Sequence, residues 1–368
     1  MKILVTGADG FIGKTLRVRM AEEGDFDVDV FTRADDVAAL PAKVAAVDAV
    51  VHLAGENRPA DPDAFMAVNG DFTAALCNAI RGSGRPVPLI FTSSIQAERD
   101  NPYGASKRAG EDAVERLATE TGQCCAIFRL PNVFGKWCRP NYNSAVATFC
   151  YNIARGEAIR VDDPAAPLSL VYVDDVANGL IAALRAPQTG LSWGVVDPVH
   201  HTTVGEVADL IHAFRDSRDT LTTERVGTGL VRALYSTYVS YLRAEDFSYA
   251  VPVHGDQRGV FVEMLKTTDS GQFSFFTAHP GITRGGHYHH SKTEKFLVIK
   301  GRARFGFRHI LTDEYHSLET SGDEPRIVET VPGWSHDITN IGDDEMVVML
   351  WANEIFDRDR PDTISRSV

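Results

Sequence analysis

The amino-acid sequence predicts an α/β fold in the N-terminal half and an all-β fold in the C-terminal half. Up to about residue 243, short apolar runs rich in β-branched residues alternate with longer amphipathic stretches. From about residue 244, short runs separated by Gly, Asp and Pro replace this pattern. A glycine-rich turn also stands between the first run and the first amphipathic stretch. A chain of 368 residues has room for two domains, which we expect at residues 1–243 and 244–368.

In the N-terminal half, we expect buried strands at residues 2–6, 28–32, 49–53, 88–92 and 126–130. The intervening stretches have the apolar spacing of amphipathic helices, at residues 13–23, 65–81 and 106–121. Strands that alternate with helices are joined by crossover connections, and these connections make the strands parallel. We therefore predict a doubly wound parallel sheet with helices on both faces.

In the C-terminal half, we expect strands at residues 261–266, 273–278, 295–299, 302–308, 326–330 and 346–351. Turn-forming residues separate these runs. Short strands with turn signals between them are typical of an all-β barrel or sandwich. The sequence therefore predicts a small β-barrel after residue 244.

The composition is that of a soluble globular protein, with 44% apolar and 24% charged residues. No apolar run approaches the roughly 18 residues of a membrane-spanning helix, and the first residues lack the pattern of a signal peptide. A net charge of −13, from 37 basic and 50 acidic residues, argues against nucleic acid as a partner. The five cysteines form no CxxC pair, so we expect free thiols in a reducing cytoplasm.

The glycine-rich turn has the residues that a dinucleotide site needs. Gly7, Gly10 and Gly13 lie where the first expected strand ends and the first helix begins. Glycine lets the backbone turn tightly and approach a pyrophosphate, which is attracted by the positive end of the helix. Glycine spacing alone is a weak signal, but its position at the first strand-to-helix junction predicts a dinucleotide cofactor.

Arg33 indicates which nicotinamide cofactor is used. It follows the second expected strand, where NAD-selective enzymes usually have an acidic residue for the ribose 2′-hydroxyl. A carboxylate there would repel a 2′-phosphate, whereas a guanidinium can bind a phosphate through two hydrogen bonds. The sequence therefore predicts NADPH, and the alternative is that Arg33 is a solvated surface residue.

Tyr103 and Lys107 form a candidate acid–base pair, because they are four residues apart and so share one helical face. A nearby ammonium stabilises a phenolate and lowers the pKa of the phenol. The pair can then donate a proton to a developing alkoxide or accept one. Ser94 ends the preceding strand and is expected to hydrogen-bond the substrate oxygen, with Ser93 as the alternative.

The C-terminal half contains a set of side chains that commonly bind metal ions: His287, His289, Glu294 and His336. The first two are two residues apart, so on a strand they point to the same side. Three imidazoles and a carboxylate suit zinc, iron, manganese, nickel or copper(II), and ligand types alone do not choose among these metals. Tyr288 and Lys292 are possible acid–base groups nearby.

The motifs of the N-terminal half together resemble the extended short-chain dehydrogenases/reductases, which act on nucleotide sugars. Besides the residues above, the resemblance rests on residues 52–55, Asn69, residues 129–135 and residues 172–176. It covers about residues 1–243 and implies a Rossmann-like fold. It further implies that the catalytic residues are Ser94, Tyr103 and Lys107.

The same resemblance implies two sets of binding residues. Cofactor contacts are implied for Gly7, Gly10, Phe11, Ile12, Gly13, Arg33, Leu53, Ala54, Gly55, Lys107, Pro131 and Val133. Substrate contacts are implied for Asn132, Lys136, Arg139 and Asn141. Ile95 and Gln96 stand where similar 4,6-dehydratases have an Asp-Glu pair. We therefore expect hydride transfer at a sugar carbon and no elimination of water.

The spacing of the candidate metal ligands resembles the two cupin motifs, which implies a cupin β-barrel (jelly roll) for residues 244–368. By this resemblance, the barrel binds one divalent metal ion, for which we expect zinc. Residues 254–261 also resemble the sugar-nucleotide epimerase branch of the cupins. Some members of that branch work without metal, and the ligand set of this chain goes beyond what they require.

A reductase followed by a metal cupin resembles, over the whole chain, a family of bifunctional capsular polysaccharide enzymes. The resemblance implies that the cupin half epimerises C3 of UDP-2-acetamido-2,6-dideoxy-β-L-arabino-hexos-4-ulose. The other half then reduces the C4 ketone with NADPH to UDP-2-acetamido-2,6-dideoxy-β-L-talose, on the way to UDP-N-acetyl-L-fucosamine. We also expect a homodimer, because barrels of this kind often pair.

Other interpretations are open at this point. The cupin could be a structural, dimerising module beside an NADPH-dependent nucleotide-sugar reductase. The chain could be a redox sensor that holds NADPH without chemistry, although a sensor has no need of Tyr103 and Lys107 as an acid–base pair. It could also join a reductase to a cupin oxygenase.

Overall fold

The computed structural model describes all residues except 257–258, 263–264, 268–270 and 355–358. The chain forms two compact units, one made of residues 1–144 and 168–202 and the other of residues 145–167 and 203–368. Residues 203–243 thus pack with the C-terminal β-strands, although they precede the change in secondary structure at residue 244. The predicted boundary at residues 243 and 244 stays a prediction.

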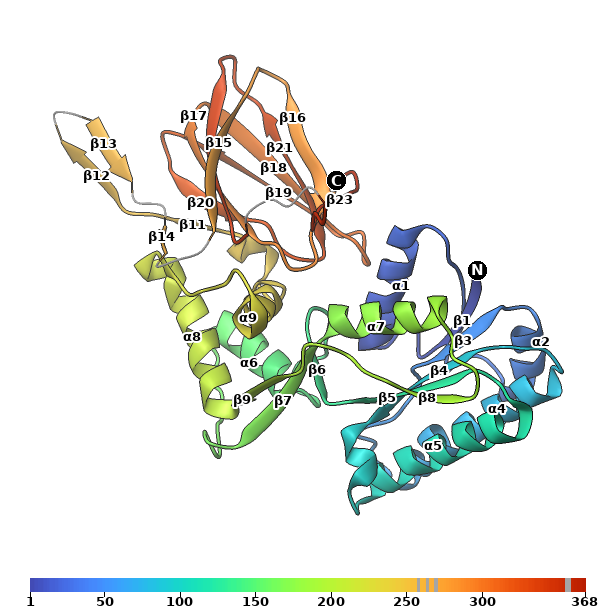
Figure 1. Cartoon of the computed structure of the whole chain (residues 1–368). Helices are drawn as coiled ribbons and strands as arrows, with labels where there is room; N and C mark the ends of the chain where they lie inside the picture. The colour runs from blue at the N-terminus through green and yellow to red at the C-terminus, as the bar shows by residue number, and fades with distance from the viewer. Residues whose placement is uncertain (257–258, 263–264, 268–270, 355–358) are drawn as a thin grey trace. The chain divides into compact units, whose positions relative to one another are not determined.

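The first unit is built on a six-stranded parallel sheet with strand order β2-β1-β3-β4-β5-β8 (Figure 1). Its strands are β1 (Lys2–Thr6), β2 (Asp27–Phe31), β3 (Ala49–His52), β4 (Leu89–Ser94), β5 (Cys125–Leu130) and β8 (Leu191–Gly194). The predicted parallel sheet is therefore confirmed, and only its edge strand β8 was not predicted. A smaller sheet contains β6 (Asn132–Phe134), β7 (Pro167–Tyr172) and β9 (His200–Thr203).

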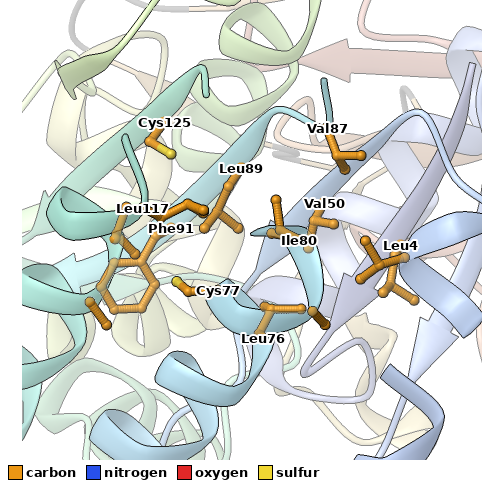
Figure 2. Packing of buried hydrophobic residues seen from close by; sticks show 14 of the residues in the cluster. Leu4, Val50, Leu76, Cys77, Ile80, Val87, Leu89, Phe91, Leu117 and Cys125 are labelled. Carbon is orange, nitrogen blue, oxygen red and sulfur yellow. The ribbon is translucent and has the colours of Figure 1, made fainter. Parts of the chain in front are cut away.

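Helices cover both faces of the parallel sheet because successive strand residues point to opposite sides. Ile3 and Val5 of β1 pack with the helices α1 (Phe11–Glu23) and α7 (Val173–Arg185). Leu4, between them, joins the cluster formed with α2 (Leu40–Ala45), α4 (Phe72–Gly82) and α5 (Pro102–Thr121). Figure 2 shows side chains of this second cluster, among them Leu4, Val50 and Leu117. Each such side chain contributes about 1.5–3 kcal/mol when fully buried.

The shorter elements of the first unit are η1 (Val37–Ala39), α3 (Asp63–Phe65), η2 (Met66–Asp71) and η3 (Ile95–Glu98). The helix predicted at residues 65–81 is present, but η2 gives its first part a π-helical turn. Throughout the described ranges, no helix is both long and apolar enough to span a bilayer. Each of the five cysteines is a thiol outside any disulfide, as predicted.

The second unit contains helices and two antiparallel five-stranded sheets. Its helices are α6 (Ala145–Ala154), α8 (Val204–Thr220), α9 (Gly229–Val239) and η4 (Ala244–Asp246). One sheet has the order β11 (Ser248–Ala250), β20 (Arg326–Glu329), β17 (Glu294–Lys300), β22 (Met346–Ala352) and β15 (Gln272–Ala278). The other has the order β19 (Tyr315–Ser321), β18 (Arg302–His309), β21 (Trp334–Asn340), β16 (Thr283–Tyr288) and β23 (Ile364–Ser365). Shorter pairs are β12 (Val253–Asp256) with β13 (Gly259–Val262), and β10 (Thr222–Thr223) with β14 (Lys266–Thr267).

The predicted all-β C-terminal half is confirmed. The expected strands near residues 273–278, 295–299, 302–308, 326–330 and 346–351 are all present. The strand expected at residues 261–266 falls partly on residues outside the described ranges. Rings of Phe296 and Phe305 meet between the two sheets with centroids 5.7 Å apart, so the sheets share one core.

A buried charge cluster explains why α8 and α9 belong to the second unit. Glu329 of β20 is paired with Lys295 of β17, and both side chains are buried. Arg218 of α8 lies 2.9 Å from Glu329, and the hydroxyl of Tyr235 on α9 donates to it at 3.2 Å. Burial raises the pKa of Glu329, but Lys295 and Arg218 lower it overall. The carboxylate therefore stays charged and fixes both helices to the sheet.

Candidate active sites

The glycine-rich turn has no room for a side chain at Gly7 or Gly13. Gly7 has a φ of +68°, and a Cβ there would lie 2.6 Å from the backbone nitrogen of Ala54. A Cβ on Gly13 would lie 2.3 Å from the carbonyl oxygen of Gly7. Gly10 caps α1, whose first backbone N–H groups are therefore open to an anion. The turn thus brings the predicted cofactor residues at 7–13 against those at 53–55.

Arg33 lies just beyond β2 with 88% of its side chain exposed. Its guanidinium is 3.1 Å from a carboxylate oxygen of Glu56, a residue that the sequence analysis missed. The hydroxyl of Tyr142 donates to the other Glu56 oxygen at 3.1 Å. Glu56 therefore connects the predicted cofactor-selecting arginine with the segment predicted to bind substrate. Its position next to residues 52–55 was the only sequence signal for it.

The two serines at the end of β4 have different partners. Ser93 is buried and donates to Glu111 at 2.6 Å. Arg129 holds the same Glu111 carboxylate through contacts of 2.8 and 2.7 Å. Ser94, in contrast, is hydrogen-bonded to Tyr103. Of the two alternatives, Ser94 is thus the serine that adjoins the candidate acid.

The structure gives Tyr103 and Lys107 complementary protonation states. Burial raises the pKa of Tyr103, and the hydrogen bond with Ser94 opposes that effect. Burial lowers the pKa of Lys107 to about 8, against the attraction of Glu111. At neutral pH the phenol is therefore protonated and the amine is charged. This differs from the sequence-based expectation of a lowered phenol pKa, because burial has the larger effect on Tyr103.

Asn69 connects the predicted cofactor residues at 53–55 with α5, the helix that carries Lys107. Its side-chain amide donates to the carbonyl of Glu56 at 2.8 Å and to Ser106 on α5 at 3.0 Å. A Cβ on Gly55 would lie 3.1 Å from the Asn69 amide oxygen and 3.2 Å from Nζ of Lys107. The π-helical turn η2 thus carries a buried amide that fixes residues 55–56 against α5.

The predicted substrate-binding residues occupy different environments. Asn132 is exposed on β6, and its amide is 3.4 Å from the carbonyl of Ser169. The exposed Arg139 stacks on the ring of Tyr142 at 4.9 Å. Asn141 is exposed and has a left-handed backbone with a φ of +52°. Pro131 and Val133 are the sequence neighbours of Asn132 and are predicted to contact the cofactor. Both are half-buried.

Lys136 has a partner that the sequence analysis did not anticipate. Its ammonium is fully buried and lies 2.7 Å from both carboxylate oxygens of Asp174. Removing one member of such a buried pair costs about 3–5 kcal/mol of stability. The geometry therefore supports a structural role for Lys136, and its contact with substrate stays a prediction.

The candidate metal ligands converge between the two antiparallel sheets. His287 lies on β16, His289 follows that strand, Glu294 begins β17 and His336 lies on β21. One potential ligand atom of each lies within 4.8 Å of the others. Pairing of β16 with β21 sets His287 opposite His336, with ring centroids 4.7 Å apart. Residues far apart in the sequence thus form the group that their spacing predicted.

The chemistry of this cluster fits a divalent metal ion. Burial, together with the neighbouring His336 and His289, lowers the pKa of His287 to about 3. His287 is therefore a neutral imidazole, the form that binds metal. An oxygen of Glu294 lies 3.1 Å from Nε2 of His289 and 3.5 Å from Nε2 of His336. Nitrogen and carboxylate donors at these separations suit a four-coordinate ion such as zinc.

Together, the parallel sheet, the glycine turn and the Ser94, Tyr103 and Lys107 group define a dinucleotide-binding enzyme of the short-chain dehydrogenase/reductase class. Residues 3–197 match the NAD dependent epimerase/dehydratase family, and residues 254–364 match the polysaccharide biosynthesis C-terminal domain. A UDP-2-acetamido-2,6-beta-L-arabino-hexul-4-ose reductase of Pseudomonas aeruginosa is 58% identical over 100% of this chain and 99% of its own length.

Solved structures agree with this match. The capsular polysaccharide assembling protein CapF of Staphylococcus aureus is 41% identical, with 100% of both chains covered and a TM-score of 0.68. The UDP-glucose 4-epimerase of Thermus thermophilus is 23% identical over 58% of this chain and 83% of its own, with a TM-score of 0.51, and it shows the fold alone. The chain belongs to the NAD dependent epimerase/dehydratase family, as a CapF-type capsular polysaccharide enzyme.

Proposed function

We propose that this enzyme acts twice on UDP-2-acetamido-2,6-dideoxy-β-L-arabino-hexos-4-ulose. The C-terminal part, a metal cupin, inverts C3, and the N-terminal part reduces the C4 ketone with NADPH. The observation that carries the proposal is the presence of an acid–base group and a separate buried ligand cluster in one chain. The name of the Pseudomonas aeruginosa relative supports a UDP-sugar with a 4-keto group as substrate. Absence of NADPH oxidation with this ketone would contradict the reductase half of the proposal.

In the reduction, protein side chains bind and protonate the oxygen on C4. When bound, NADPH supplies a hydride to C4. The Ser94 hydroxyl holds the carbonyl oxygen, and Tyr103 gives its phenol proton to that oxygen as negative charge develops. The charged Lys107 stabilises the phenolate that remains. The product is an alcohol at C4.

In the epimerisation, the same ketone makes the neighbouring C3 hydrogen acidic. A base removes this proton to leave an enolate, and proton return from the opposite face inverts C3. His287, His289, Glu294 and His336 would hold the metal ion, for which we propose zinc. A bound divalent ion supplies positive charge that stabilises an oxyanion by several kcal/mol. Reduction of the ketone afterwards removes the acidity and fixes the new configuration.

Replacing Arg33 by alanine is expected to weaken the binding of NADPH but not that of NADH. Loss of a charge-assisted hydrogen bond costs about 1.5–3 kcal/mol, so the KM for NADPH should rise about 10- to 100-fold. The KM for NADH should hardly change, because NADH lacks the 2′-phosphate. Steady-state kinetics with both cofactors measures the change. Arg160→Ala is the matched control, since Arg160 is 87% exposed. An equal rise in the KM for NADPH and for NADH would show that Arg33 does not bind the 2′-phosphate.

The reduction is expected to slow above about pH 8. Burial lowers the pKa of Lys107 to about 8, so the amine loses its charge as the pH rises through that value. A neutral amine stabilises the phenolate less, which makes Tyr103 a weaker proton donor. The kcat/KM for the ketone should therefore fall about tenfold per pH unit on the alkaline side. If the residual rate of the Lys107→Met variant falls in the same way above pH 8, the fall is caused by the titration of another group.

We also propose that the protein is a homodimer. Phe275 and Phe273 lie on β15, an edge strand of its sheet, with 71% and 46% of their surfaces exposed. Two exposed aromatic rings on an edge strand form a surface that a second copy would cover. Light scattering on a sizing column should give a dimer for the wild type and a monomer for Phe275→Asp. A monomeric wild-type protein would contradict this proposal.

A further inference from the structure

The loop between β16 and β17 carries the candidate ligand His289 and leads to the candidate ligand Glu294, the first residue of β17. One distant carboxylate holds this loop. The side chain of Asp362 accepts the backbone N–H groups of His290, Ser291 and Lys292 at 2.8, 2.7 and 2.7 Å. It also accepts the hydroxyl of Ser291 at 3.0 Å. A single carboxylate therefore fixes three consecutive peptide groups between the two ligands.

The backbone of Asp362 acts on a ligand directly. Its carbonyl oxygen accepts a hydrogen bond from Nδ1 of His289. Because a carbonyl only accepts, Nδ1 must carry a proton, which leaves Nε2 as the ring nitrogen that can bind a metal ion. That Nε2 faces an oxygen of Glu294 at 3.1 Å. Both atoms are therefore placed to bind the same metal ion.

The segment around Asp362 runs along the other ligand strands. In β23, Ser365 pairs with His287 and Ile364 pairs with Tyr288 of β16. The hydroxyl of Ser335, which precedes His336 on β21, donates to the carbonyl of Arg366 at 2.5 Å. Residues 362–366 therefore contact His287, His289 and the residue before His336.

Arg232 of α9 approaches the same loop from a different element. Its guanidinium donates to the Ser291 hydroxyl at 2.5 Å and lies 3.7 Å from the Asp362 carboxylate. Ser236, one turn later, donates to the carbonyl of Ser291 at 2.6 Å. The loop is thus held from two sides, and the Asp362 side chain, only 15% exposed, has a defined position.

We propose that Asp362 is a positioning residue for the metal cluster. It sets the tautomer and orientation of His289 through its carbonyl and holds the loop to Glu294 through its carboxylate. The inference rests on the proposed metal centre. Loss of a residue that orients metal ligands through hydrogen bonds commonly changes metal affinity 10- to 100-fold.

Binding of Co²⁺ to the full-length protein tests this role. The dissociation constant is measured by competition with a chelator, and the visible spectrum of the bound ion reports its coordination. Asp362→Ala should bind Co²⁺ about 10- to 100-fold more weakly and with an altered spectrum. Asp362→Asn keeps one acceptor oxygen and should lie between this variant and the wild type. Asp343→Ala, an exposed carboxylate in the same unit, should match the wild type.

The outcomes separate the possible explanations. Folded Asp362 variants that bind Co²⁺ as tightly as the wild type, with the same spectrum, would overturn the proposal. If Asp362→Ala does not fold, Asp362→Asn decides by the same two criteria. A wild-type protein that binds no Co²⁺ would overturn the metal centre itself, and the positioning role with it. Loss confined to the Asp362 variants supports the role.

Discussion

Replacing Tyr103 by phenylalanine is expected to reduce ketone-dependent NADPH oxidation by about 10²- to 10⁴-fold, the usual contribution of a positioned general acid. Only the hydroxyl is lost, so the packing of the ring on Phe65, with centroids 5.6 Å apart, is preserved. Without a proton donor at C4, the charge on the alkoxide stays uncompensated. Fluorescence titration should show that NADPH still binds.

Two controls make this result specific. Tyr151→Phe removes a phenol in the other unit, where the ring packs against Tyr241, and should keep full activity. Ser93→Ala and Ser94→Ala compare neighbours with different partners, and the rate should depend on Ser94. Unchanged turnover in Tyr103→Phe would remove Tyr103 from the mechanism. Loss of NADPH binding in this variant would point to a structural role instead.

Replacing His336 by alanine is expected to stop deuterium uptake at C3 in D2O. The variant loses one of three imidazoles in the cluster and therefore the site that would stabilise charge on the enolate. Loss of several kcal/mol of stabilisation corresponds to a slowing of about 10²-fold or more. NADPH binding should remain, because it depends on the other unit. NMR of the sugar nucleotide follows the exchange.

His279→Ala is the matched control for this variant. His279 is exposed and lies outside the ligand cluster, so its removal should leave exchange at the wild-type rate. Exchange that continues unchanged in His336→Ala would place the epimerisation outside the cluster. The C-terminal part would then be better explained as a structural module beside a reductase.

The inner strands of the first unit could be predicted well because they are mostly apolar. Residues 2–6 and 49–53 match β1 and β3 closely, since both faces of a parallel sheet are buried and strand residues are then uniformly apolar. β8 was missed because Leu191–Gly194 is short and only half-buried. Such an edge strand has no pattern that distinguishes it from a loop.

The second unit was harder to predict because its functional strands are polar. β16 contains Gly285 and Gly286, both with positive φ, and its pairing shifts register before His287. β21 carries His336 among polar neighbours. Strands that supply ligands lose the apolar alternation on which sequence reasoning depends, so both were missed although their ligands were found.

The site residues that could be predicted are those that lie close together in the sequence. Tyr103 with Lys107 and His287 with His289 are close in the sequence, so local spacing was enough to find them. Glu56 and Asp362 are single carboxylates whose partners come from distant segments. Asp362 lies 72 residues after His290, whose N–H it accepts. Only the tertiary structure brings such groups together, and no sequence pattern marks them.

The central claim is that one ketone serves first to acidify C3 and then to accept hydride at C4. NMR of the UDP-linked 4-keto sugar with the enzyme in D2O tests it most directly. Without NADPH, we expect deuterium at C3 and no change at C4. With NADPH, we expect a C4 alcohol that carries deuterium at C3. A sugar that neither takes up deuterium nor consumes NADPH would contradict the account.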